Sequence, residues 1–561
     1  MRELIVLSHR LDIAAAAQLA RQATQAVVVT TCPHLADRAT SEGLRVELLQ
    51  LPGNDVLADA YQDARRRSLA LQARIDGHLA RFDPLAPDCG WGQLELFYAF
   101  YTLGGFARLW DGLLRQVQAQ VWHVPMPDLP FRYGGHSYLP GLLLLERLAA
   151  GGQRLRAYRY ELPPWDPLLL PDLDATAGDP DLLVHLPTCF YDHAHFEQAV
   201  LASGRSALHL PSQYYAVDLP SLPAAAHHDL AHAEQKLSDA QRARIDGVCA
   251  AIAAEVVQDL VPLLATAAYH QPQADSLVAG LRRQMVFAEL LARRFDRRPP
   301  RALLLSNHDA GLHGPLLTLA RRHRSRVCMV PHSKIYNAPV PSAAGLDLQC
   351  LAHPVQGVPV HDTQGMAVPA ATLAYPEQLQ WSFKPAQPLR VLGVLLTGVS
   401  YSALCGTDLD RFCRGLRRIV DWCAANGVQC RIRCKPSEPL VGLLTAAVGL
   451  PQDQLLADMG GSLDDFAQAC GLCLTYDQLT SGAVELLRLG VPTLHALVRP
   501  LLLEEQCMMD AAIVPRADLH EVLQRLGLFV ADAQQLWTFG RNQFLAYARA
   551  WSDARPLQTF L

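Results

Sequence analysis

Two polar clusters in the sequence follow short apolar runs and carry side chains that can accept protons or attack a carbon atom. The first cluster, residues 307–314, contains His308 and Asp309, and the second begins at His332. A carboxylate with imidazoles beside it can serve as a general base or as a nucleophile. We therefore expect Asp309 to be catalytic, with His308, His313 or His332 tuning it. The alternative role for Asp309 is to cap the helix that follows.

A third polar stretch has the composition of an anion site. Residues 472–497 predict a strand, a polar turn, a short helix and a second strand, with Thr480, Ser481 and Gly482 in or beside the turn. The end of a parallel strand and the start of the next helix present hydroxyl and backbone N–H groups that suit phosphate. Glu485 lies one turn into the helix, so its carboxylate can reach the same place. The alternative for Glu485 is a solvated carboxylate on a helix surface.

Three further residues extend this predicted anion site. Lys435 ends an apolar stretch, residues 429–434, that we expect to be a strand. Thr397 and Ser400 follow another predicted strand, in a turn of the kind that can hold phosphate. A lysine at a strand end can neutralise charge on a departing phosphate. A solvated lysine at the end of a strand is the alternative interpretation of Lys435.

The elements that must position these residues alternate between apolar runs and helical patterns. Such alternation predicts an α/β fold with parallel sheets. We expect residues 1–380 to form one Rossmann-like domain with a helical insertion at about 225–297. Residues 381–535 are expected to form a second Rossmann-like domain, and residues 536–561 a helix that returns to the first. The polar clusters would then face each other across a cleft between the domains.

Composition limits the classes of function. The chain has 561 residues, of which 50% are apolar and 18% charged, and its formal net charge is −5. These values suit two large cores and do not favour nucleic acid as a partner. The 14 cysteines lack zinc-site spacing and the Asp-x-Asp pairs follow no clear strand, so we expect no bound metal. We interpret the cysteines as reduced thiols of a cytoplasmic protein. We expect no transmembrane helix, whereas contact with a membrane surface stays open.

The stretch 389–532 resembles the nucleotide-binding half of GT-B glycosyltransferases. The residues that carry the resemblance are Thr475, Thr480, Ser481, Glu485, Gly490 and Pro492 of the strand–turn–helix–strand unit, and Lys435 and Pro436 upstream of it. Lys435 stands where a histidine is common in these families. The similarity is greatest to transferases of Kdo and sialic-acid-type sugars and to CDP-glycerol glycerophosphotransferases.

The resemblance implies a GT-B fold in which residues 381–535 bind a nucleotide-sugar donor and residues 1–380 bind a glycan or glycolipid acceptor. It favours a metal-independent glycosyltransferase, with Kdo or a nonulosonic acid from a CMP donor as one candidate substrate and a surface polysaccharide as acceptor. Two other classes stay open. A CDP-polyol phosphotransferase would be expected to have a histidine beside Lys435 and a basic face toward the membrane. A sugar-nucleotide epimerase, or a non-catalytic protein on the same scaffold, would need no acceptor.

Overall fold

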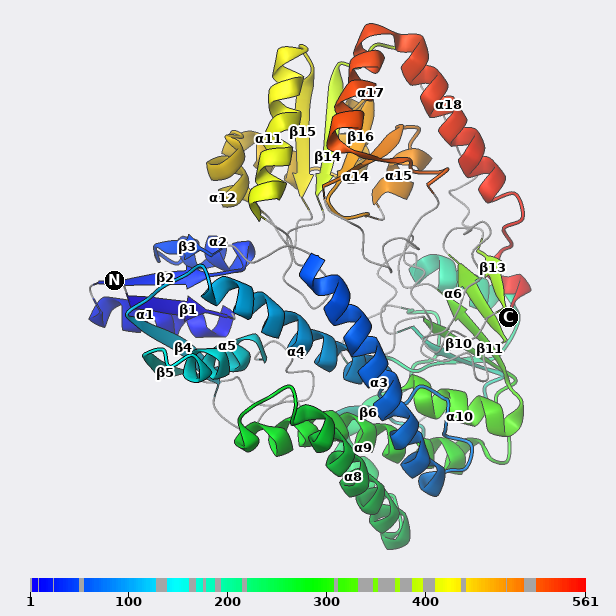
Figure 1. Ribbon diagram of the computed structural model, residues 1–561. Coiled ribbons are helices and arrows are strands. Elements are labelled where there is room, and N and C mark those ends of the chain that lie inside the picture. The colour runs from blue at the N-terminus through cyan, green and yellow to red at the C-terminus, as the bar shows by residue number, and fades with distance from the viewer. Residues whose placement is uncertain are drawn as a thin grey trace.

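The computed structural model describes helices, strands and connections over most of the chain (Figure 1). Within the described part, strands and helices alternate to form three successive parallel sheets. The described residues are 3–8, 10–23, 25–49, 55–127, 139–160, 168–174, 178–186, 193–213, 219–306, 311–330, 347–351, 369–373, 386–396, 409–434, 440–480, 482–498 and 511–561.

The first sheet contains five parallel strands in the order β3-β2-β1-β4-β5. Its strands are β1 (Glu3–Leu7), β2 (Ala26–Thr30), β3 (Val46–Leu48), β4 (Val121–Pro127) and β5 (Leu155–Tyr160). The helices of this part are α1 (Ile13–Gln22), α2 (Pro33–Ser41), α3 (Asp55–Phe82), α4 (Gln93–Leu114) and α5 (Leu139–Ala150). β1 pairs with β2 on one side and with β4 on the other, so the strand order reverses between β1 and β4. Such a reversal is the switch point at which open parallel sheets bind ligands.

The second sheet contains six parallel strands in the order β13-β12-β11-β10-β7-β8. Its strands are β7 (Leu182–His185), β8 (Ala207–His209), β10 (Ala302–Ser306), β11 (Arg326–Val330), β12 (Leu348–Leu351) and β13 (Ala370–Thr372). Helix α6 (His193–Ala202) follows β7, and α10 (His313–His323) follows β10. β7 lies between β8 and β10, so the switch point of this sheet lies between β7 and β10.

A helical segment separates β8 from β10. It begins with β9 (His227–Asp229), which pairs antiparallel with β6 (Leu169–Pro171). The helices that follow are α7 (Leu230–Gln235), α8 (Asp239–Leu260), the 3-10 turn η3 (Ala267–Tyr269) and α9 (His270–Phe295). Ser238 starts α8 with a capping box, because its hydroxyl accepts from Gln241 N–H and the Gln241 side chain accepts from Ser238 N–H.

The third sheet contains five parallel strands in the order β15-β14-β16-β17-β18. Its strands are β14 (Val391–Leu396), β15 (Gln429–Cys434), β16 (Leu472–Tyr476), β17 (Thr493–Leu497) and β18 (Arg516–Asp518). The helices of this part are α11 (Leu409–Ala425), α12 (Val441–Leu443), α13 (Gln452–Gly460), α14 (Leu463–Ala469), α15 (Gly482–Arg488), α17 (Leu519–Ala531) and α18 (Ala533–Ala550). The unit β16–α15–β17 is parallel, which confirms the βαβ arrangement that the sequence predicts for residues 472–497.

The first and second sheets share one hydrophobic core, whereas the third sheet has its own. The shared core joins Leu4 of β1 to Leu303 of β10 through apolar residues of α3, α4 and α9. The core of the third sheet contains residues between Leu389 and Leu536. The predicted α/β class with Rossmann-like parallel sheets is confirmed. The pattern of the sequence did not reveal that two such sheets, rather than one, lie before residue 374.

The segment after α18 returns to the second sheet. Tyr547 of α18 stacks on Trp551, which directly follows the helix, with ring centroids 4.1 Å apart, and both pack with apolar residues of α15. Beyond the helix, Arg555 N–H donates to the carbonyl of Thr372 at 3.0 Å, and Leu557 packs into the core of the second sheet. The third unit is therefore joined to the second sheet by non-covalent contacts as well as by the chain.

The apolar run at residues 455–457 predicts a short strand from the sequence alone, and this prediction is wrong. These residues belong to α13, which buries Leu455 and Asp458 at the three-residue spacing of one helix face. The Asp458 carboxylate accepts from Arg431 Nε at 2.8 Å and from Ile432 N–H at 3.2 Å, so the helix is held against β15. An apolar run of three residues is too short for its periodicity to separate strand from helix.

The first turn of α10 packs closely against Trp91, and this packing predicts the effect of replacing Gly314. A Cβ atom built on Gly314 would lie 2.7 Å from the indole ring of Trp91, which is fully buried and donates its N–H to Thr318 Oγ1 at 3.2 Å. Gly314→Ala should therefore overpack the core and cost about 1–3 kcal/mol of stability.

The matched control is Gly247→Ala in α8, where an added Cβ would meet nothing within 4 Å. This change should be neutral or stabilising by up to ~1 kcal/mol, because alanine is the better helix former. Calorimetric melting of both variants measures the difference. Equal melting temperatures for the two variants would contradict the packing described for Trp91.

Candidate functional site

The carboxyl edge of the third sheet contains a buried acidic residue in an unusual backbone conformation. Asp477 directly follows β16, is 3% exposed and has a φ of 66°. The N–H of Gln478 donates to the carbonyl of Tyr476 at 2.8 Å, so Asp477 is the central residue of a tight three-residue turn. Positive φ is costly for a residue with a Cβ and persists where the surroundings enforce it, often at functional sites. β16 borders the switch point of this sheet, next to β14.

Polar side chains form a buried layer beneath this edge. Thr475 Oγ1 and His495 Nδ1, on the neighbouring strands β16 and β17, lie 2.8 Å apart, and both residues are fully buried. The hydroxyl of Tyr476 donates to the carbonyl of Phe412 at 2.6 Å. Burial raises the pKa of Tyr476, so the phenol stays protonated and holds α11 against the sheet. These contacts fix the backbone from which Asp477 projects.

The predicted phosphate turn uses some of its donors internally. Gly482 N–H donates to Thr480 Oγ1 at 3.2 Å, and Ala483 N–H donates to the Thr480 carbonyl at 3.0 Å. Gly482 also lies close to β14, since an added Cβ would be 3.0 Å from Leu395 Cδ1. Thr480 and Gly482 are therefore brought together over the end of the sheet, as the sequence predicts, with the Thr480 hydroxyl ordering the turn.

Glu485 lies in α15 and is paired within the helix. Its Oε2 atom is 2.9 Å from Nε of Arg488, and both side chains are about three-quarters buried. The remaining predicted site residues lie outside the described part of the chain. They are His308, Asp309, His332, Thr397, Ser400, Lys435 and Ser481.

The carboxyl edge of the second sheet contains buried histidines, of which the sequence analysis selected His313 and missed His185 and His209. His185 is the last residue of β7 and His313 is the first residue of α10, and both are fully buried. Their ring centroids are 6.0 Å apart with the ring planes nearly perpendicular. His209 ends the neighbouring strand β8, where burial lowers its pKa to about 4, with smaller contributions from His227 and His193. The sequence signal was weak, because a histidine inside the apolar run 182–186 reads as part of a core strand.

The carboxyl edges of the first and third sheets meet at a contact between α2 and α12. The Asp37 carboxylate of α2 accepts the backbone N–H of Gly442, and a Cβ on Gly442 would collide with it. Leu48, the last residue of β3, packs against the core of the third sheet. In Figure 1 the strands of the third sheet point toward this contact and toward the two other sheets. This arrangement brings two ligand-binding edges of parallel sheets close together.

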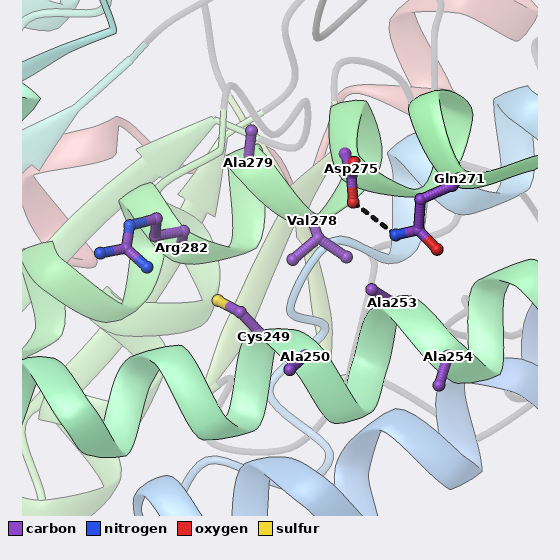
Figure 2. A pocket seen from close by; sticks show the side chains of 9 residues that line it. All are labelled: Cys249, Ala250, Ala253, Ala254, Gln271, Asp275, Val278, Ala279 and Arg282. Carbon is purple, nitrogen blue, oxygen red and sulfur yellow. Dashed lines mark hydrogen bonds between the residues drawn. The ribbon is translucent and has the colours of Figure 1, made fainter.

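A surface groove of about 460 Å³ lies elsewhere, between α8 and α9 (Figure 2). Its walls are mostly small and apolar, and its polar groups pair with one another or with neighbours. Arg282 contacts Glu234 at 2.7 Å, and Gln271 donates to Asp275 at 2.7 Å. Burial raises the pKa of the Cys249 thiol to about 11, so this cysteine is protonated and weakly nucleophilic near neutral pH. The groove thus offers apolar contact rather than a catalytic group.

The described residues contain no group of three or more His, Cys, Asp or Glu side chains arranged to hold a metal ion. None of the helices seen in this part of the chain is both long enough and apolar enough to cross a membrane.

Comparison with known proteins finds similarity to solved structures and none to sequence families or curated sequences. No protein-family model matches the chain, and no curated protein matches its sequence. A solved UDP-N-acetylglucosamine 2-epimerase shares 11% identity, covers 66% of this chain and 92% of its own, and has a TM-score of 0.35. MurG of Acinetobacter baumannii shares 12% identity over 67% of this chain and 96% of its own, with a TM-score of 0.35. The spinosyn rhamnosyltransferase SpnG, solved with spinosyn aglycone, shares 16% identity over 67% of this chain and 97% of its own, again with a TM-score of 0.35. Similarity at this level assigns no activity to the chain.

The contact between Asp37 and Gly442 predicts a pH-dependent stability. Burial raises the pKa of Asp37, which outweighs the lowering effects of the Gly442 N–H and of His34. A carboxyl group whose pKa is higher in the folded state costs stability when it is ionised, and this cost disappears as the pH falls and the group is protonated. Asp37→Asn keeps an oxygen that accepts from Gly442 and removes the charge.

The Asn variant should therefore be at least as stable as the wild type at pH 7, and its advantage should shrink as the pH is lowered through the range where aspartate titrates. Melting temperature measured against pH checks this, with Asp59→Asn on the exposed surface of α3 as control. A variant at Asp37 that is clearly less stable at pH 7 would show that the ionised form is required there.

Proposed function

We propose that this protein is a glycosyltransferase of the GT-B type, which transfers a sugar from a nucleotide donor to a glycan or glycolipid acceptor. The observation that carries this proposal is the meeting of two parallel-sheet edges at Asp37 and Gly442. The edge of the third sheet also carries Asp477, which is buried and has a positive φ. A transfer reaction needs two substrates held side by side with water excluded, and two facing sheet edges provide two such binding places. The resemblance of residues 389–532 to the donor half of GT-B enzymes supports the assignment of the third sheet to the nucleotide.

In this proposal the nucleotide phosphates bind over the end of β16, where Thr480 and Gly482 form the turn. Ser481, Lys435, Thr397 and Ser400 are the further phosphate ligands that we propose from the sequence. A phosphate leaving group gains negative charge during transfer, and hydroxyl, amide and ammonium donors stabilise that charge. Glu485 is proposed as a ribose contact, presented to the site as a carboxylate paired with Arg488.

The acceptor is proposed to bind within residues 1–380, where the first sheet, which meets the third, shares one core with the second. Asp309 would be the general base or nucleophile, with His308 and His332 beside it. A donor whose charge is balanced by protein groups needs no metal ion, so we propose a metal-independent reaction, in which activity persists in EDTA.

Among donors, we propose a CMP-linked Kdo or nonulosonic acid, and a surface polysaccharide or related glycoconjugate as acceptor. The support for this choice is the similarity of the β16–α15–β17 sequence to transferases of such sugars. We place the reaction in the cytoplasm, with peripheral contact to a membrane where the acceptor is lipid-linked.

Nucleotide binding tests the donor site. A ligand present at 100 times its Kd stabilises the folded state by ~2.7 kcal/mol, which raises the melting temperature of the unit that binds it. A panel of CMP, CDP, UDP, GDP and dTDP should therefore contain a nucleotide that shifts the melting curve, with CMP or CDP expected first. Thr480→Val removes the hydroxyl that orders the turn, and it should abolish or strongly reduce this shift.

Ser462→Ala is the matched control for Thr480→Val. Ser462 Oγ also accepts a backbone N–H, from Asp465 at 3.0 Å, but it does so at the start of α14. Loss of either hydroxyl should cost about 1 kcal/mol of stability. The Ser462 variant should keep the nucleotide-dependent shift. If both variants respond to the nucleotide as the wild type does, the turn at Thr480 is not the phosphate site.

Asp309→Asn tests the proposed catalytic carboxylate. Asparagine caps helices as well as aspartate, so a capping role predicts little change in melting temperature or in rate. Loss of a general base lowers the rate by about 100- to 10,000-fold. We expect a loss of that size in kcat, measured as sugar transferred from the donor found in the nucleotide panel. A near-wild-type rate would leave Asp309 as a helix cap, and His332 and Asp192 would be the next residues to substitute.

A further inference from the structure

The contact between α2 and α12 places a carboxylate against a glycine that its own helix does not require. Gly442 is not in the left-handed region, so its backbone conformation is open to any residue. A Cβ atom built on it would lie 2.5 Å from Oδ1 and 3.1 Å from Cγ of Asp37, so the carboxylate fills the space of a side chain. Glycine is also a poor helix former. The residue type at position 442 therefore fits the approach of Asp37 rather than the needs of α12.

Asp37 does not stabilise its own helix either. α2 begins at Pro33, and Asp37 lies after the first turn, outside the region in which a carboxylate stabilises a helix N-terminus. Burial raises the pKa of Asp37, and this effect outweighs the opposing influence of His34 in the same helix. The described hydrogen bond of this carboxylate is the one from the N–H of Gly442, which belongs to the third unit.

On its other side, α12 is fixed to the end of β15. The N–H of Leu440, which directly precedes α12, donates to Sγ of Cys434, the last residue of β15. Leu440 and Leu444, on either side of Gly442, are fully buried in the same core as Cys434. Because a close-packed core deforms little, a shift of Gly442 would be transmitted to the end of β15.

The end of β15 lies at the sheet edge where we propose that phosphate binds. Cys434 pairs with the last residue of β14, at the carboxyl edge of the third sheet. Lys435, the next residue in the chain, is one of the phosphate ligands that we propose from the sequence. A series of described contacts therefore runs from Asp37, beside the first sheet, through Gly442 and Leu440 to the residue that precedes this lysine.

We propose that Asp37 is a positioning residue for the nucleotide phosphate, an inference that rests on the proposed function. By accepting the N–H of Gly442 it holds α12 and, through α12, the end of β15 from which Lys435 follows. In this role Asp37 acts through other residues and needs no contact with the donor. Coupling between two sites is reciprocal, so a bound nucleotide should strengthen the contact between α2 and α12 by the same factor. The part of the chain proposed to bind the acceptor thus contributes to the affinity for the donor.

The test is the affinity of the full chain for the nucleotide, among CMP, CDP, UDP, GDP and dTDP, that shifts the wild-type melting curve most. Asp37→Ala removes the acceptor of the Gly442 N–H, and calorimetric titration should show binding weakened by about 5- to 150-fold, the usual range of coupling between sites. Asp37→Asn keeps an acceptor oxygen and should bind like the wild type. Gly442→Ala disrupts the contact from the other side, because the carboxylate or α12 must move, and it should weaken binding as well.

Asp532→Ala is the matched control. The Asp532 carboxylate also accepts a backbone N–H, from Gln534 at 2.8 Å, but it does so at the start of α18. This place is near the start of β14 and away from the carboxyl edge, since Leu389 N–H donates to the carbonyl of Phe529 at 3.4 Å. Loss of this cap should lower the melting temperature and leave nucleotide affinity unchanged. A merely structural role for Asp37 predicts the same behaviour for Asp37→Ala.

A double-mutant cycle with Lys435→Ala tests the route of the effect. If Asp37 acts by positioning this lysine, Asp37→Ala should weaken binding in the wild-type background and have no further effect once Lys435 is replaced. Equal losses in the two backgrounds would show that Asp37 acts elsewhere, and they would overturn the proposal. Wild-type affinity in Lys435→Ala alone would overturn it as well.

Unchanged affinity in both Asp37→Ala and Gly442→Ala, in a chain whose wild type binds nucleotide, would overturn the inference and leave the proposed donor site intact. If Asp37→Ala does not fold, Gly442→Ala decides the question. A wild type that binds none of the five nucleotides would overturn the proposed function, and the role of Asp37 with it. Binding by the wild type therefore distinguishes the two failures.

Discussion

Parallel pairing of strands is the constraint on which the rest of this structure depends. Two parallel neighbours cannot be joined by a tight turn, so each strand must be followed by a crossover that returns the chain to the opposite edge. All three sheets obey this rule in the described residues, and as a result every strand of a sheet ends at the same edge. Residues that are far apart in the sequence, such as His185 and Leu305, are neighbours for this reason.

The three sheets are not equivalent in how they are held. The first and second share a core built on α3 and α4, so their relative position is set by buried apolar packing. The third has a separate core and touches the first through Leu48 and through the contact of Asp37 with Gly442. A shared core resists rearrangement because close-packed interiors deform little. The described contact of the third unit with the first sheet includes an ionisable carboxyl group, so its strength depends on pH.

The sequence predicted local elements well and their assembly less well. The strand, turn, helix and strand predicted for residues 472–497 are present as β16, α15 and β17, because apolar runs separated by turn residues are strong local signals. The division of the first 373 residues into two sheets depends on which strands pair, which no local pattern encodes. For the same reason the sequence placed Thr480 and Gly482 together, within one turn, but did not single out His185 or Asp37, whose partners lie in other segments.

The contact between Thr372 and Arg555 has a mechanical consequence. The chain reaches residue 373 in the second sheet before the third unit begins, and after α18 it returns to the same place, where Leu373 and Arg555 form a β-bridge. The chain thus enters and leaves the third unit at neighbouring points, Leu373 and Arg555, on one side of that unit. In Figure 1 the other side of that unit, at α12, lies across the molecule from this attachment. A small rotation about this attachment would displace α12 more than the end of α18, so it would act directly on the contact between Gly442 and Asp37.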